Sequence, residues 1–141
     1  MKDSGNIHKK VQEMCDCFAT TDPLKEMSIL KNDPDTQSAA IKWVALAALH
    51  GVNSNAEKIS IFSGAAGETT VVAKYRTTEL PSPGHDVGRK IVDTFRDITH
   101  IDADKGKTAL ALGIRDSSID LTVNIKKKDG GHKITIAFPK G

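Results

Sequence analysis

The chain contains few cysteines, few aromatic residues and no long hydrophobic run. Among its 141 residues are two cysteines, four phenylalanines, one tryptophan and one tyrosine. A small domain held together by disulfides would need several cysteine pairs, so that class is excluded. The longest apolar run, residues 43–49, is far shorter than the ~20 residues that span a bilayer. We therefore expect no membrane insertion.

The two cysteines, Cys15 and Cys17, lie two positions apart in a segment with helical periodicity. Side chains at positions i and i+2 of a helix point to nearly opposite sides, so this pair forms neither an easy disulfide nor half a metal site. We expect two reduced thiols. The N-terminus is polar and does not resemble a signal peptide, which indicates a cytoplasmic protein.

Patterns of catalytic or metal-binding residues are also missing. Residues 106–108 look like the end of a phosphate-binding loop, but Ile101 stands where the first glycine belongs, and a strand pattern follows instead of a helix. No two histidines stand four positions apart, as ligands of one metal on a helix would. The histidines are His8, His50, His85, His100 and His132. We expect neither an enzyme nor a bound metal or cofactor.

Residues 107–138 contain the clearest structural signal. Apolar and polar residues alternate through three successive segments, which is typical of amphipathic strands. The connecting residues, 115–118 and 129–131, are rich in turn formers. The apolar positions are Leu110, Leu112, Ile114, Ile119, Leu121, Val123, Ile125, Ile134, Ile136 and Phe138. The pattern predicts an antiparallel meander whose apolar face must be covered by the rest of the chain.

The preceding residues supply candidate helices and a hairpin. Helical periodicity predicts helices near residues 4–18, with Ser4 as cap, near 23–30, with Asp22 as cap, and over 36–49, with Gly51 as the stop. Two alternating segments near residues 58–63 and 71–76 predict a hairpin. A further helix should begin at Ser82 and Pro83 and bury Val87, Ile91, Phe95 and Ile98.

These elements predict an α+β fold. N-terminal helices are followed by a β-β-α-β-β-β unit, a mostly antiparallel sheet with helices packed on one face. We expect residues 1–35 to form a helical extension and residues 36–141 an α+β domain, together one compact unit.

The net charge is only +2, and the basic excess lies in the meander. Lys126, Lys127 and Lys128, with Lys133 across the turn, predict a basic hairpin tip. Such a tip can grip phosphates, or it can be a charged strand edge that resists aggregation. Because aromatic residues are not interleaved with these lysines, we do not expect a nucleic-acid partner.

Residues 41–138 also carry a family resemblance. A helix ends near Gly51, the strand Glu-Lys-Ile-Ser-Ile-Phe follows at 57–62, and the second strand closes with Lys-Tyr-Arg at 74–76. The last two strands read Ser-Ile-Asp-Leu-Thr-Val-Asn at 118–124 and Gly-His-Lys-Ile-Thr-Ile-Ala at 131–137. In this order the chain resembles the PAS-like second N-terminal domain of the ATPases that drive type II secretion and type IV pilus assembly.

The resemblance implies a nucleotide-facing role for basic residues, because arginines of that domain reach toward nucleotide on a neighbouring P-loop domain. By this resemblance Lys74 and Arg76, with Arg89, are the candidate ligand-binding residues. The chain departs from the family at Thr122 and Ala137, where arginines are expected. It also has no Walker lysine, so we expect no ATP hydrolysis.

The sequence favours a non-catalytic protein-interaction or regulatory module. Such a module would bind another protein, or a second copy of itself as a homodimer, through a sheet face or a strand edge. The alternative is a small-ligand or nucleotide sensor that uses the basic residues named above.

Overall fold

The structure is a computed structural model that describes residues 4–18, 20–64, 68–74, 78–80, 82–99, 101, 105–114, 117–128 and 130–139, with the backbone alone at 4–6, 78, 114, 117 and 128. Its helices are α1 (Ser4–Cys17), α2 (Pro23–Ile29), the short 3-10 helix η1 (Leu30–Asn32), α3 (Thr36–Asn53) and α4 (His85–Thr99). Its strands are β1 (Lys58–Ser63), β2 (Thr69–Lys74), β3 (Thr78–Leu80), β4 (Lys105–Ile114), β5 (Ser117–Lys128) and β6 (Gly131–Ala137).

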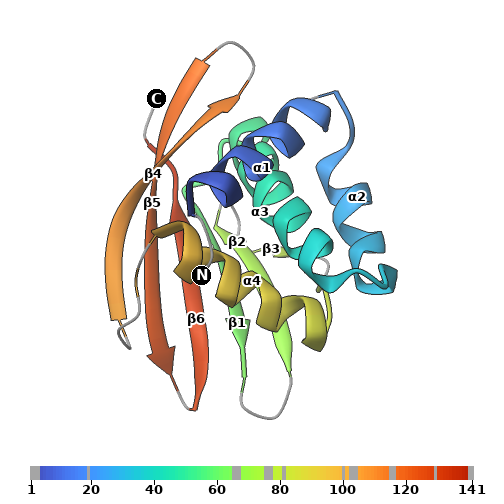
Figure 1. Ribbon diagram of the computed structural model, residues 1–141, viewed down its shortest axis with the longest axis vertical. Coiled ribbons are helices and arrows are strands. Elements are labelled where there is room, and N and C mark those ends of the chain that lie inside the picture. Colours follow the sequence, from blue (N-terminus) through green and yellow to red (C-terminus); the bar gives the residue numbers. More distant parts are fainter. Residues whose placement is uncertain are drawn as a thin grey trace.

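The six described strands form one antiparallel sheet in the order β3-β2-β1-β6-β5-β4. The four described α-helices lie on one side of this sheet (Figure 1). The predicted α+β class, with helices on one face of an antiparallel sheet, is therefore confirmed. The sequence pattern did not predict β3, which adds a short strand beside β2.

The meander forms where the alternation predicts it. Leu121, Val123 and Ile125 of β5 are buried, and Ile119 is partly buried against the same core. The hairpin between β5 and β6 turns through Gly130, whose φ is +80°. Because β5 and β6 both lie inside the sheet, the interpretation of their lysines as a charged strand edge was wrong.

The helix layer is built around α3. This alanine-rich helix is buried from Ala39 to Gly51 except at Lys42, because it lies among α1, α2 and α4 and also contacts β1. Trp43 of α3 packs edge-on against Phe95 of α4, with ring centroids 6.5 Å apart and an interplanar angle of 82°. Buried residues of α1 and α2 belong to the same hydrophobic core. No helix in the described ranges is both long and apolar enough to cross a membrane.

The predicted stop of α3 at Gly51 was wrong. The helix continues to Asn53, and the left-handed residue that follows it is Asn55, with φ of +56°. A Cβ at position 51 would overlap the ring of Phe138. Gly51 is therefore required for close packing against the chain that leaves β6, not for ending the helix.

Of the predicted helix starts, that of α2 is confirmed and that of α4 is wrong. Asp22 caps α2 as expected, since its Oδ1 accepts from the N–H groups of Leu24 and Lys25. The prediction for α4 was wrong, because this helix begins at His85 instead of Pro83. The Ser82 hydroxyl donates to the Thr69 carbonyl oxygen at 2.7 Å and thereby ties the entry of the helix to β2. The side chain of Ser4 lies outside the described residues.

Candidate functional site

The face of the sheet that points away from the helices bears mainly polar side chains. Because successive side chains of a strand point to opposite faces, the positions between the buried ones lie here, and most are exposed or half-buried. We call this surface the open face. Its lysines and acids in the described residues are Lys58, Lys74, Lys105, Lys107, Lys126, Lys133, Glu79 and Asp120.

Three lysines of the open face are direct neighbours across the strands. Lys105 of β4 is opposite Lys126 of β5, and Lys126 is also opposite Lys133 of β6. We call these three residues the lysine row. Lys107 lies on the same face two positions further along β4. Like charges directly opposite each other destabilise a sheet. The acids of the open face do not offset this repulsion closely, because Glu79 lies on β3 and Asp120 lies toward the other end of β5.

A hollow of about 230 Å³ lies beside the lysine row. All its lining side chains can donate hydrogen bonds, since they carry amines, an amide or a hydroxyl. They are Lys58, Asn124, Lys126, Lys133 and Thr135. The Thr135 hydroxyl lies 3.2 Å from that of Ser60 on the neighbouring strand. The arrangement is suited to holding negatively charged oxygen atoms.

The structure separates the four lysines of the predicted hairpin tip. Lys126 and Lys133 lie together on the open face, as cross-strand neighbours. Lys127 is opposite His132, and by strand alternation it belongs to the other face. The side chain of Lys128 lies outside the described residues.

Sequence reasoning missed Lys58, Lys105 and Lys107 as members of this surface. Alternation predicted Lys58 and Lys107 on the polar sides of their strands, whereas Lys105 lies before the predicted meander, which began at residue 107. Their position next to Lys126 and Lys133 depends on the order and register of the strands, which alternation does not reveal.

The residues implied by the family resemblance do not form one cluster. Lys74 lies on β2 at the open face, and its Nζ is 3.4 Å from Glu57 Oε2. Arg89 is exposed on α4, in the layer on the other side of the sheet. One small ligand would not contact both. Arg76 lies outside the described residues.

The titratable groups with shifted pKa values are buried in the helix layer. Burial raises the pKa of the Cys15 thiol to about 12, with a smaller contribution from the Asp16 carboxylate. Burial lowers the pKa of His50, while the Asp22 carboxylate acts in the opposite direction. Cys17 is exposed on the same helix as Cys15. The described residues contain no group of three metal-binding side chains.

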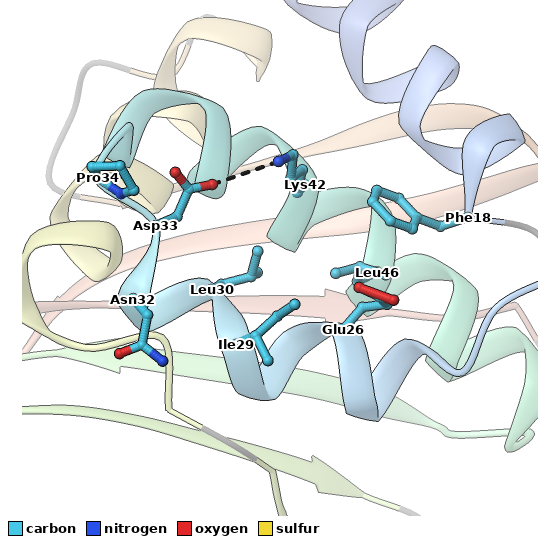
Figure 2. A pocket seen from close by; sticks show the side chains of 9 residues that line it. All are labelled: Phe18, Glu26, Ile29, Leu30, Asn32, Asp33, Pro34, Lys42 and Leu46. Atoms are coloured by element: carbon cyan, nitrogen blue, oxygen red, sulfur yellow. Dashed lines mark hydrogen bonds and ion pairs between the residues drawn. The ribbon is translucent and has the colours of Figure 1, made fainter.

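A second hollow, of about 260 Å³, lies in the helix layer (Figure 2). Ile29, Leu30 and Leu46 give it an apolar lining, and Ile29 is 56 % exposed. Across it, Lys42 Nζ lies 3.5 Å from Asp33 Oδ2. Because Lys42 pairs with Asp33 and the remaining charged side chain of the lining is that of Glu26, the hollow offers an anionic ligand less than the open face does.

The comparison of the sequence with family models and curated proteins finds no relative. No family model matches the chain, and no curated protein sequence matches it. The resemblance to the PAS-like domain of secretion ATPases stays a prediction.

Proposed function

We propose that this protein is a non-catalytic interaction module that binds an acidic surface of another protein through the open face of its sheet. The observation that carries the proposal is the lysine row, Lys105, Lys126 and Lys133. Three like charges placed side by side weaken a sheet. Their destabilising effect is offset when a partner supplies carboxylates, so the arrangement favours binding over stability.

The size of the hollow beside the lysine row favours a protein partner over a nucleotide. Pockets for drug-sized ligands usually have volumes of about 300–1,000 Å³, whereas this hollow has about 230 Å³. It suits single acidic groups presented by a surface better than a whole nucleotide. The alternative of a nucleotide sensor predicts thermal stabilisation by nucleotides, about 2.7 kcal/mol at a hundred times the dissociation constant.

The proposal is tested by capture from nuclease-treated extract of the native cell, followed by binding of the purified partner. The Lys126→Glu/Lys133→Glu variant should lose an acidic partner that the wild type retains at low salt and releases at high salt. The control is Lys25→Glu/Lys31→Glu, which changes the net charge equally at two exposed positions of the helix layer. If the open-face variant kept the partner while the control lost it, the proposal would be wrong. Loss of all capture after nuclease treatment would indicate nucleic acid instead.

A further inference from the structure

The outer edge of β4 has partners over only part of its length. β4 is the last strand of the described sheet, so one of its sides has no neighbour among the described strands. Near its end, α1 supplies partners for it. His8 Nε2 lies 2.7 Å from the Ala111 carbonyl oxygen, and because that oxygen can only accept, the ring nitrogen donates. Gln12 Nε2 donates to the Gly113 carbonyl oxygen at 2.7 Å, and Gln12 Oε1 accepts from the Gly113 N–H at 2.7 Å.

These two side chains, which we call the edge latch, imitate a neighbouring strand. His8 and Gln12 are four residues apart on a helix, a rise of about 6 Å. Ala111 and Gly113 are two residues apart on a strand, a rise of about 6.8 Å. The side-chain amide of Gln12 offers the same donor and acceptor as a peptide group, so it pairs with Gly113 as a strand would. The edge latch thus closes this end of β4.

The first half of the edge is open. In an antiparallel strand the N–H and C=O groups of every second residue point to the same side. Since those of Ala111 and Gly113 point outward, so do those of Lys105, Lys107 and Ala109. Within the described residues no strand or side chain forms a hydrogen bond with the outward groups of these three residues. We call them the open half of β4, and such unpaired groups are a template for another strand.

We propose that the open half of β4 binds an extended segment of the partner protein as an additional strand, with acidic residues at every second position. The acidic character rests on the proposed function. Lys105 and Lys107 both project onto the open face, so every second side chain of an added strand would lie beside them. Acidic side chains there would form opposite-charge pairs across the strands, while the main-chain hydrogen bonds would supply affinity.

The edge latch and the lysines also argue against a second copy of the chain as the occupant. Two copies of β4 paired edge to edge would bring both sets of lysines onto one face of the joined sheet, where like charges repel. The edge latch would block the last part of each strand. Because it occupies the edge at Ala111 and Gly113, pairing with a partner segment ends at Ala109.

The test uses the full chain and a synthetic ten-residue peptide of alternating Glu and Thr, with a Lys-Thr peptide as control. Amide hydrogen exchange followed by NMR reports on single residues of β4. We expect the Glu-Thr peptide to slow exchange at Lys107 and Ala109, whose N–H groups point outward. The Lys-Thr peptide should leave the exchange rates of these two residues unchanged. Two further Glu-Thr peptides are N-methylated either at every Glu amide or at every Thr amide. The one that loses the N–H groups facing β4 should bind at least tenfold more weakly than the other, because alternate N–H groups of a strand point to opposite sides.

Substitutions in β4 and α1 distinguish peptide binding at the edge of β4 from binding on the open face. In Ala109→Pro the lost N–H points away from β5, a position where an edge strand tolerates proline, so the fold should persist while peptide affinity falls at least tenfold. Ala109→Val keeps the N–H and should bind like the wild type. The His8→Ala/Gln12→Ala variant frees the outward groups of Ala111 and Gly113. We expect two- to tenfold tighter binding, which corresponds to one or two net hydrogen bonds.

The outcomes distinguish this inference from the proposed function. Slowed exchange at Lys107 and Ala109 together with loss of affinity in Ala109→Pro supports strand addition. If Ala109→Pro bound as tightly as the wild type while Lys126→Glu/Lys133→Glu lost the peptide, the edge would not be the site and the open face would remain the binding surface. If Ala109→Pro were unfolded, unchanged exchange at Lys107 and Ala109 in the wild type with saturating peptide would overturn the inference alone.

Discussion

The two faces of the sheet differ in the side chains that they carry. The face beneath the helices is apolar and buried, with Ile59, Ile61, Val123 and Ile134 at 0–1 % exposure. The open face of the same strands carries lysines opposite one another. The first arrangement stabilises the fold through burial of apolar surface, and the second weakens it through charge repulsion. This difference indicates that the covered face supplies stability, and it is the basis of the binding role that we propose for the open face.

The largest expected effect tests the covered face. Phe95 is fully buried and packs against Trp43. We expect Phe95→Ala to lower the free energy of unfolding by about 3–5 kcal/mol, as large-to-small core substitutions do. The matched variant on the open face is Val72→Ala, at a side chain that is 37 % exposed. It should cost within about 0.5 kcal/mol in urea unfolding. If Phe95→Ala and Val72→Ala lowered the free energy of unfolding equally, the two faces would not differ in their contribution to stability.

A smaller effect is expected where the helix layer meets the end of the sheet. Gly51→Ala introduces a methyl group that overlaps the Phe138 ring, so we expect a loss of about 1–3 kcal/mol from overpacking. The same substitution in a Phe138→Leu background should cost less, because the smaller side chain leaves room. Urea unfolding of the four proteins of this double-mutant cycle measures the coupling. Additive costs would mean that the two residues are not in contact.

The pH dependence of stability should report on the buried His50. Its pKa in the folded protein lies below the ordinary value of 6.5, because burial disfavours the imidazolium. The folded state therefore binds fewer protons than the unfolded state, and stability is lost as pH falls below about 6.5 toward the folded pKa. Thermal unfolding from pH 8 to pH 5 measures this. In His50→Gln the decline over this interval should be shallower, and an unchanged slope would assign it to other groups.

The smallest effect is a gain of stability on the open face. Lys126→Ala removes the central charge of the lysine row, so we expect an increase of about 0.2–1 kcal/mol at low salt. The increase should shrink at high salt because the repulsion is screened. Lys127→Ala is the matched control, since its cross-strand neighbour is His132 on the other face. If both variants lost stability equally, the lysine row would not be a strained arrangement.

Much of the fold could be predicted because its signals are local. Alternation located the strands of the meander, and Asp22-Pro23 marked the start of α2. The predictions failed where a distant residue decides the conformation. Gly51 reads as a helix stop, but the helix continues and packs against Phe138. Ser82 was predicted to cap a helix, but its hydroxyl donates to the Thr69 carbonyl oxygen on β2.

The proposed binding surfaces were only half predictable for the same reason. Lys126 and Lys133 face each other across a two-residue turn, so the sequence alone indicated that they are close. The addition of Lys58, Lys105 and Lys107 required the strand order, which joins segments far apart in the chain. The edge latch joins Gln12 to Gly113, which are 101 residues apart in the chain. No local sequence pattern predicts this contact.

The amino-acid sequence by itself determined which side of each strand is apolar, because successive side chains point to opposite faces whatever the strand pairs with. Only the tertiary structure decided which lysines stand side by side and which part of β4 is left open. Those features depend on the order of the strands and on where α1 packs, and both arise from contacts between residues distant in the chain.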